Sequence, residues 1–481
     1  MSATAIRPES VAAERAERLA PLERLEALCD AGSVQPIRTR VSSRVLGDRA
    51  RDGDGVVGAT GTVAGRPIAC YAQDGSYLGG SLGERHAETV VRVLQTAERA
   101  KIPVVGFVES GGARMQEGTA ALGGYGRIFR HTVGLTGVVP QISVVSGASA
   151  GGGAYSPALT DLIVMTADAA MFLTGPGVVR EALGEEIDAA SLGGPKVHEH
   201  NGVCHLVERD DRAAAARVRD LLSYLPSCAG EPLPRSEPLR PEFSDPAAVV
   251  PVEPRRAYDV REALRGIVDA GSLLEIWPRW GRNVVTALAR IDGRPVGIVA
   301  NQPHYLGGVL DAIGSEKAAR FVGFCDSFGL PLIAVVDTPG FMPGSKQERA
   351  GVIRHGASLV RAFASARVPK FTVILRKSYG GAFITMNSRD LGADLVLAWP
   401  DAELGIMSPR AAVGIVNRRE LAAAADPEAE RTRLADAYAH EHLRASAAAA
   451  SGFVDEIVEP SETRDRLTWA LRTMSGASAR T

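Results

Sequence analysis

The chain has 481 residues, of which 45% are hydrophobic and 23% charged, and its formal net charge is −2. Single hydrophobic cores stop growing near about 250–300 residues, so this length predicts more than one core. The near-neutral charge argues against a nucleic-acid-binding protein, which would carry a basic domain or stripe. The five cysteines are far apart and odd in number, which argues against a disulfide framework and against a paired-cysteine metal site.

The first elements predicted along the chain are a helix and an antiparallel pair of strands. Residues 10–30 place leucines at three-residue spacing, which predicts an amphipathic helix. The first twenty residues mix acids with arginines and lack an apolar core, so no secretory signal is expected. Two short strands follow within 56–74, separated by the turn at 64–66. No apolar run approaches the roughly 18–20 residues of a membrane span, and we expect a cytoplasmic protein that does not bind membranes.

The same order of elements then occurs twice. Residues 84–100 predict a helix that leads into an apolar strand at 102–108. A segment at 226–254 holds eight of the 28 prolines, and its restricted backbone is typical of a semi-rigid connector. After it, a helix near 259–270 precedes a second antiparallel pair at 284–302. The tail beyond residue 410 predicts helices, with a last short strand at 454–460.

An internal duplication is the most informative feature of the sequence. Residues 102–176 and 330–409 both contain an apolar strand, a glycine-rich loop, a helical stretch, a second strand, a glycine-rich turn and a third strand. Pro103 and Pro331 are 228 residues apart, which is too long for a solenoid repeat of roughly 20–50 residues. Alternating strands and helices predict an α/β fold with mostly parallel sheets. We expect three parts: an N-terminal domain at 1–228, a proline-rich linker at 229–256 and a C-terminal domain at 257–481.

Two glycine-rich turns carry the chemistry that the sequence indicates. Ser146–Tyr155 and Arg376–Phe383 each follow an apolar strand and precede a helix-compatible stretch. Glycine lets the backbone approach a ligand, and N–H groups at a helix start can bind a phosphate or the oxyanion of a thioester enolate. Tight turns without a ligand are the alternative interpretation, which the occurrence of both turns in register disfavours.

Several better-known catalytic motifs are missing from these turns. Neither turn matches the phosphate-binding loop of nucleotide hydrolases or the nucleophile elbow of α/β-hydrolases. A dinucleotide-binding glycine motif does not open a first β–α unit. No histidine is close in sequence to either turn, so a serine–histidine pair is unsupported. Chemistry based on backbone donors suits a reaction whose base arrives with the substrate or cofactor.

Other polar residues have simpler interpretations. The histidines and cysteine within 198–205 could suggest a zinc site. Glu109 and Asp337 end apolar strands, where turn or capping roles are favoured over an acid–base pair. Gln347 is expected to shape its loop rather than to transfer protons. Arg376–Lys377 could contact a phosphate or a carrier domain, although two basic residues after a strand are weak evidence.

Long stretches of the chain resemble one known family. SGGARMQEG (110–118), GVVPQISVVSGASAGGGAYSPALTD (137–161), VDTPGFMPGSKQERAGVIRHGA (336–357) and RKSYGGAFITMNSRDLGADLVLAWPDAELGIM (376–407) carry the resemblance. They are similar to the carboxyltransferase β subunit of biotin-dependent acyl-CoA carboxylases, in particular the actinobacterial acetyl-/propionyl-CoA type. The resemblance runs from about residue 20 to 460. It implies two tandem crotonase-like domains of the ClpP/crotonase superfamily, which act across a dimer.

The resemblance also implies a reaction and partners. N-carboxybiotin on a separate carrier protein would release CO₂, and its ureido anion would remove the α-proton of an acyl-CoA. The enolate would attack CO₂ and give malonyl-CoA or methylmalonyl-CoA, precursors of fatty acids or polyketides, without a metal in this chain. Acyl-CoA would bind the N-terminal domain and carboxybiotin the C-terminal domain. The partner would be an α subunit with biotin carboxylase and carrier domains, and the chain would form a hexamer as a trimer of dimers.

Site residues follow from the resemblance by position. The N–H groups that would stabilise the thioester oxyanion belong to Gly151, Gly152 and Ala113. Those that would stabilise the biotin oxyanion belong to Gly381, Ala382 and Phe341, and biotin would also contact Gly380. The residues that would line the acyl pocket are Ile384, Gly153 and Tyr155.

Two alternative functions stay open, and a departure from the family pattern favours one of them. Met407-Ser408-Pro409 stands where the family usually has glycine after the methionine. A catalytically weak scaffold for the α subunit is therefore one alternative function. A biotin-dependent acyl-CoA decarboxylase, which runs the transfer in reverse, is another.

Overall fold

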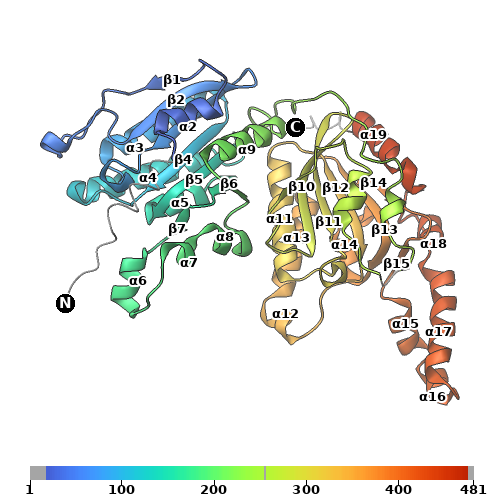
Figure 1. Ribbon diagram of the computed structural model, residues 1–481. Coiled ribbons are helices and arrows are strands. Elements are labelled where there is room, and N and C mark those ends of the chain that lie inside the picture. The colour runs from blue at the N-terminus through green and yellow to red at the C-terminus, as the bar shows by residue number, and fades with distance from the viewer. Residues whose placement is uncertain (1–17, 254–255, 475–481) are drawn as a thin grey trace. The chain divides into compact units, whose positions relative to one another are not determined.

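The computed structural model describes residues 18–253 and 256–474, and the chain divides into two compact units, Met1–Pro232 and Leu233–Thr481. Each unit is built on an eight-stranded sheet (Figure 1). The order of the strands along each sheet is the same in both units, with one extra short strand paired to the fifth main strand. The predicted duplication is therefore a duplication of topology.

The first unit starts with an antiparallel hairpin and continues as a parallel sheet. The antiparallel strands are β1 (Gln35–Ile37), β2 (Val56–Val63) and β3 (Arg66–Gln73). Parallel to β3 run β4 (Val104–Ser110), β5 (Gln141–Ala150), β6 (Leu162–Thr166) and β8 (Leu206–Glu208), and β7 (Ala170–Phe172) pairs with the end of β5. The helices are α2 (Pro21–Leu28), α3 (Glu84–Ala100), α4 (Thr119–Gly134), α5 (Gly152–Ala158), α6 (Pro176–Leu183), α7 (Ala189–Gly193), α8 (Pro195–Asn201) and α9 (Asp211–Tyr224).

The second unit repeats this arrangement. Its strands are β9 (Leu274–Ile276), β10 (Val284–Ile291), β11 (Arg294–Asn301), β12 (Leu332–Thr338), β13 (Lys370–Tyr379), β14 (Leu395–Ala398), β15 (Glu403–Gly405) and β16 (Glu456–Ile457). Its helices are α10 (Val260–Arg265), α11 (Ala312–Ser327), α12 (Ser345–Arg349), α13 (Val352–Ser365), α14 (Gly380–Thr385), α15 (Pro409–Val416), α16 (Arg418–Ala423), α17 (Pro427–Tyr438), α18 (Ala445–Ala450) and α19 (Thr463–Thr473). In Figure 1, α11 and α13 lie along the second sheet, while α15, α16 and α17 project away from it.

Local sequence explains these elements. Every residue of β4 and of β12 is buried, as expected for parallel strands that are covered on both faces. The hairpin turns use two successive residues with positive φ, Ala64-Gly65 (48° and 75°) in the first unit and Asp292-Gly293 (56° and 70°) in the second. Such turns match the twist of the strands that they join. The hairpins are therefore duplicated in their turn geometry as well as in their position.

Most of the predicted elements are confirmed, and two helices differ from their predicted bounds. The helix predicted at 84–100 has those bounds as α3. The helix predicted at 259–270 ends early, at Arg265. Of the helix predicted at 10–30, only Pro21–Leu28 is helical in the described part, and residues 10–17 lie outside the described residues. None of the described helices combines the length and apolar composition that a membrane crossing requires.

From Ser236 onward, the proline-rich segment packs on the second unit. Ser236 N–H donates to the Gly293 carbonyl at 3.1 Å, and Glu242 N–H donates to the Arg265 carbonyl at 3.1 Å. Val250 is buried in the hydrophobic core of the second unit. The apolar residues between the prolines therefore anchor a segment whose composition indicated only a connector.

Candidate active site

The loops after β4 and β5 are neighbours in the first unit. The two strands run in parallel, and a register shift brings Ser110 opposite Ser149. Two residues after Ser110, Gly112 lies close to the Ala150 carbonyl: a Cβ placed on Gly112 would be 3.6 Å from that oxygen. The carboxyl ends of adjacent parallel strands thus bring together the loop with Ala113 and the glycine turn, as ligand sites in α/β sheets require.

Backbone pairing in the described part of the chain leaves the Ala113 N–H without an acceptor. Leu82 and Ala113 form an isolated parallel bridge, in which Leu82 N–H donates to the Gly112 carbonyl at 2.8 Å. Arg114 N–H donates back to the Leu82 carbonyl at 2.9 Å. Within the described residues, the N–H of Ala113 between these two bonds has no acceptor. Ala113 can therefore donate to a ligand.

The two N–H groups predicted as donors in the glycine turn, those of Gly151 and Gly152, differ in whether they already have an acceptor. Gly151 has φ of 56° and its N–H donates to the Phe172 carbonyl at 3.1 Å, so this N–H is already occupied. Gly152 is the first residue of α5, where N–H groups have no partner within the helix, and no acceptor for it occurs in the described part of the chain. Of the predicted pair, Gly152 is the residue whose N–H can serve a ligand.

Tyr125 and Ser110 explain why glycine follows β5. A Cβ on Gly152 would lie 2.6 Å from the Tyr125 ring, and one on Gly153 would lie 2.8 Å from Ser110 Cβ. Tyr125 Oη and Ser110 Oγ are hydrogen-bonded at 2.8 Å, and Ser110 Oγ also donates to the Gly80 carbonyl at 3.0 Å. Burial raises the pKa of Tyr125 to about 12, so the phenol stays neutral. This support under the turn was not predicted from the sequence.

The second unit repeats the loop geometry with different side chains. Leu310 and Phe341 form the equivalent bridge, with Leu310 N–H donating to Gly340 O at 3.0 Å and Met342 N–H donating to Leu310 O at 2.7 Å. Among the described residues, the Phe341 N–H between them has no acceptor. The glycine turn of this unit forms the first turn of α14, which contains Gly380, Gly381 and Ala382. Each unit thus presents one loop donor beside one helix start.

The side chains predicted for the acyl pocket belong to different units. Tyr155 lies on α5 and Ile384 on α14, and each side chain is 50% exposed. The ring of Tyr155 meets that of Phe129 edge-on, with centroids 6.1 Å apart. That these side chains line an acyl pocket stays a prediction.

Comparison with known proteins identifies the family. The model of the carboxyl transferase domain matches residues 13–480. The chain belongs to the carboxyl transferase domain family. It is 46% identical over 429 residues to the propionyl-CoA carboxylase carboxyltransferase subunit of Haloferax mediterranei, covering 87% of this chain and 82% of the relative. It is 41% identical to the methylmalonyl-CoA decarboxylase subunit alpha of Propionigenium modestum, covering 95% and 86%.

A solved structure extends this likeness to the whole fold. The transcarboxylase 12S hexamer, determined with hydrolysed methylmalonyl-coenzyme A bound, superposes with a TM-score of 0.92 at 41% identity. The match covers 100% of this carboxyl transferase and 98% of the 12S chain. The predicted family and the predicted pair of duplicated α/β domains are thereby confirmed.

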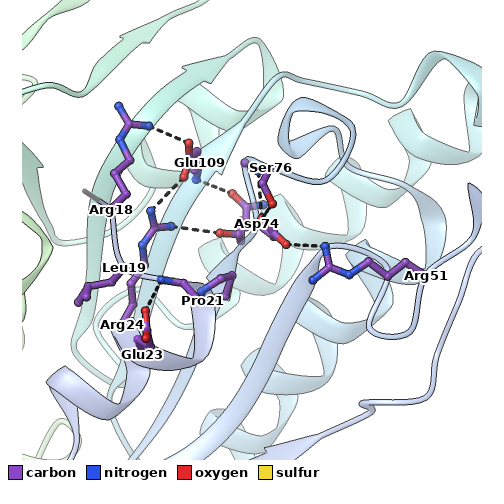
Figure 2. Close-up of a pocket in the computed structure, with 12 residues that line it drawn as sticks. Arg18, Leu19, Pro21, Glu23, Arg24, Arg51, Asp74, Ser76 and Glu109 are labelled. Atoms are coloured by element: carbon purple, nitrogen blue, oxygen red, sulfur yellow. Dashed lines mark hydrogen bonds and ion pairs between the residues drawn. The ribbon is translucent and has the colours of Figure 1, made fainter. Parts of the chain in front are cut away.

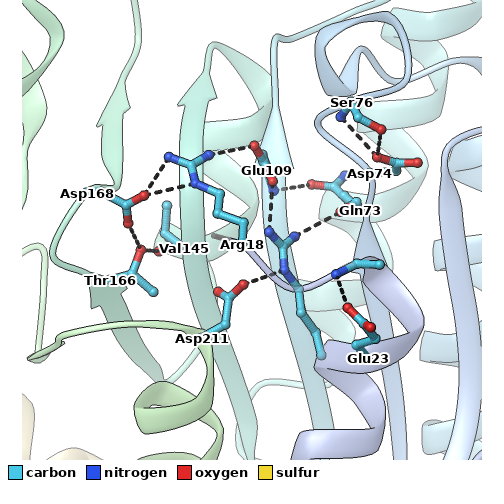
Figure 3. A network of polar contacts seen from close by, with 12 residues as sticks. Arg18, Glu23, Gln73, Asp74, Ser76, Glu109, Val145, Thr166, Asp168 and Asp211 are labelled. Carbon is cyan, nitrogen blue, oxygen red and sulfur yellow. Dashed lines mark hydrogen bonds and ion pairs between the residues drawn. The ribbon is translucent and has the colours of Figure 1, made fainter. Parts of the chain in front are cut away.

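Glu109 of this carboxyl transferase is neutralised by arginines behind the β4 loop. Its carboxylate pairs with Arg18 at 2.9 Å and with Arg24 at 3.1 Å, and Arg24 also binds Asp211 at 2.9 Å (Figure 3). Glu109, Arg18 and Arg24 border a cavity of about 320 Å³, which Arg51 also lines (Figure 2). The arginine pairs therefore give Glu109 a structural role.

Asp337 and the adjacent basic pair have a similar role in the second unit. Arg376 Nε donates to Asp337 at 2.8 Å, and Lys377 Nζ lies 3.7 Å from the same carboxylate. Arg376 Nη1 also donates to the carbonyls of Pro251 and Glu253 at 3.1 and 3.0 Å. Arg376 therefore fastens the proline-rich segment to β13, which explains its position better than a phosphate contact would.

The histidines within 198–205 bind backbone groups. His198 Nε2 lies 2.6 Å from the Met171 carbonyl, and His205 Nδ1 accepts from Ile163 N–H at 3.0 Å. Cys204 Sγ is 3.0 Å from the Leu206 carbonyl. In the parts of the chain that the structure describes, no three His, Cys, Asp or Glu side chains are grouped to hold a metal ion.

Proposed function

We propose that this chain transfers a carboxyl group from carboxybiotin to the α-carbon of a short acyl-CoA. The observation that carries the proposal is the pair of loop-and-turn sites, one in each unit of a carboxyl transferase, whose free N–H groups suit oxyanions. The relatives named for propionyl-CoA carboxylase and the 12S structure with methylmalonyl-coenzyme A support this substrate class. The products would be methylmalonyl-CoA from propionyl-CoA and malonyl-CoA from acetyl-CoA.

The two sites divide the stabilisation of charge between them. In the first unit, Ala113 and Gly152 would donate to the thioester oxygen as the enolate forms. In the second, Phe341, Gly381 and Ala382 would donate to the ureido oxygen of biotin. Biotin supplies the carboxyl group and the base, so the chain itself needs no proton-transferring side chain. Each backbone donor of this kind is worth on the order of 10²–10³ in rate.

A separate protein would deliver the biotin. We propose an α subunit with biotin carboxylase and carrier domains as the partner. A hexamer of this chain, as the 12S structure describes for its own chain, is the proposed assembly. The choice between acetyl and propionyl groups depends on the acyl pocket, for which Ile384 and Tyr155 remain the proposed lining residues.

Decarboxylation is the second candidate, because the Propionigenium modestum relative carries that name. The scaffold alternative has less support. Pro409 is the first residue of α15, as Pro176 is the first residue of α6, and proline is favoured at that position. Met407-Ser408-Pro409 is thus compatible with a helix start that the first unit shares, and it gives no reason for lost activity.

A single comparison separates these functions. The purified chain is incubated with a biotinylated α subunit, ATP, bicarbonate and acetyl-, propionyl- or butyryl-CoA. Carboxylated acyl-CoA is the expected product. A second incubation contains methylmalonyl-CoA and free biotin without ATP. Rapid loss of CO₂ there, with no carboxylated product in the first incubation, would favour the decarboxylase, and no reaction in either would overturn the proposal.

A further inference from the structure

A buried arginine fastens the loop that carries Ala113. Arg114 follows Ala113 directly and its side chain is fully buried. Arg114 Nη1 donates to Asp54 Oδ1 at 2.6 Å and to Glu117 Oε1 at 2.8 Å, and Nη2 donates to the Ser81 carbonyl at 3.0 Å. The loop is thereby tied to the segment before β2 and to the residues that precede α3.

The two carboxylates are themselves held in place. Asp54 Oδ2 accepts from His86 N–H at 3.0 Å, and Glu117 Oε2 accepts from Glu84 N–H at 2.6 Å. Burial opposes the ionisation of Glu117, but hydrogen bonds from Glu84 N–H and other donors lower its pKa. Both acceptors therefore connect Arg114 to the first turn of α3, an element with many buried residues.

The second unit holds the same carbonyl position without a cation, by an amide that also donates to Asp311 at 3.0 Å. The residue that follows its loop donor is Met342. Asn283 Nδ2 donates to the Val309 carbonyl at 2.8 Å. Val309 is 228 residues after Ser81, whose carbonyl Arg114 binds in the first unit. A neutral amide is thus sufficient to hold this backbone position.

The glutamate of the cluster also has a neutral counterpart. Gln347 Oε1 accepts from Ala312 N–H, the first residue of α11, at 3.1 Å. Ala312 is 228 residues after Glu84, whose N–H binds Glu117 in the first unit. An amide oxygen is sufficient for this bond, so the negative charge at position 117 serves Arg114.

We propose that Arg114, paired with Asp54 and Glu117, is a positioning residue that holds the Ala113 N–H where the thioester oxyanion develops. The inference rests on the proposed function, because this oxyanion forms only on an acyl-CoA. The side chain of Arg114 is fully buried within the protein, so it acts through the loop. Removing it would leave two buried carboxylates without their counter-charge and allow the loop to shift. A misplacement of about 1 Å can lower the rate about 10²-fold.

The test combines kinetics with hydrogen exchange on the full-length protein. Carboxyl transfer from methylmalonyl-CoA to free biotin is measured for the wild type, Arg114→Met and Arg114→Lys. We expect Arg114→Met to lower kcat at least about 10-fold, with KM for the acyl-CoA within about threefold. Deuterium uptake of the peptide 111–116 should rise in the same variant. Arg114→Lys, which keeps the charge, should recover part of kcat.

Arg464→Met is a matched control in the second unit. Arg464 donates to the Ile267 carbonyl at 2.8 Å and to Asp269 at 2.6 Å. Asp269 in turn accepts from the N–H groups of the β10–β11 turn, at the end of the sheet opposite to the donor loops. This variant removes a comparable guanidinium, and we expect a lower melting temperature with kcat within about twofold.

The outcomes are distinguishable. Unchanged kcat and unchanged exchange in Arg114→Met would overturn the inference, as would an equal loss of kcat in Arg114→Met and Arg464→Met. If Arg114→Met does not fold, Glu117→Gln copies the chemistry of Gln347, and a fall in kcat of about threefold without a change in KM is expected. If the wild type transfers no carboxyl group, the proposed function fails, whereas exchange at 111–116 still decides whether Arg114 holds the loop.

Discussion

The duplicated glycines at 152 and 381 provide a sharp prediction about the two sites, because a methyl group has different room at each. A Cβ on Gly152 would lie 2.6 Å from the Tyr125 ring, about 1 Å closer than the roughly 3.5–4.0 Å of carbon atoms in contact. A Cβ on Gly381 would lie 3.6 Å from the Phe341 ring, which is an ordinary contact. Gly152→Ala must therefore displace the turn or the tyrosine, and Gly381→Ala need not.

The expected magnitudes follow from this difference. A displacement of about 1 Å of the Gly152 N–H should lower kcat about 10²-fold, which corresponds to about 2.7 kcal/mol. Overpacking at this position should also lower the free energy of unfolding by about 1–3 kcal/mol. Gly381→Ala should keep kcat within about threefold and should not lower stability.

The assay is carboxyl transfer from methylmalonyl-CoA to free biotin, with melting temperature and coenzyme A affinity measured on the same samples. Both variants must bind coenzyme A as the wild type does, because no side chain of the site is removed. Equal activity of the two variants, or a Gly152→Ala variant with wild-type kcat, would refute the assignment of Gly152 as a donor whose position matters.

Three further predictions concern buried polar groups of the first unit. Tyr125→Phe removes the hydrogen bond to Ser110 and should lower the unfolding free energy by about 1 kcal/mol in a urea titration, and full retention of stability would contradict the packing described. Burial lowers the pKa of His86 to about 3, so its contribution to stability is complete above about pH 6.5 and is lost as the pH falls toward 3. Wild-type stability should therefore fall by up to about 1.4 kcal/mol per pH unit more than that of His86→Gln over this range, and parallel curves would refute the assignment. Burial raises the pKa of Asp161 to about 7, so its contribution is present below about pH 4 and is lost as the pH rises through 7. Asp161→Asn should thus gain stability relative to the wild type between pH 5 and pH 8, and a constant difference would exclude this effect.

Local patterns were sufficient to predict most of the fold. The apolar strands, the amphipathic helix at 84–100 and the two hairpins depend on hydrophobic periodicity and turn residues, which are properties of short segments. The repeat offset of 228 residues predicted two domains with the same order of elements, because equivalent segments occur at this spacing. The end of α10 could not be predicted from the sequence, since helix ends depend on packing more than on composition.

The hydrogen bonds within the candidate site could not be predicted, because they join residues that are far apart in the sequence. Arg114 and Asp54 are 60 residues apart, and their pairing follows from the strand order. Three successive glycines at 151–153 could not show which N–H was free, because the acceptor for Gly151 is supplied by Phe172 on a different strand. The two copies do differ at this point in sequence, because Arg114 stands where the other loop has Met342.

The different anchors of the two loops have a consequence for folding. Two tandem sheets with the same strand order can exchange equivalent segments while the chain folds, which is a common error of repeated domains. If the segment with Arg114 entered the second sheet, its guanidinium would meet Asn283 and Asp311 instead of Asp54 and Glu117. The first sheet would then keep Asp54 and Glu117 without their cation, and breaking a buried ion pair in this way costs about 3–5 kcal/mol. We therefore expect that this cluster also directs each half of the chain to assemble with its own strands.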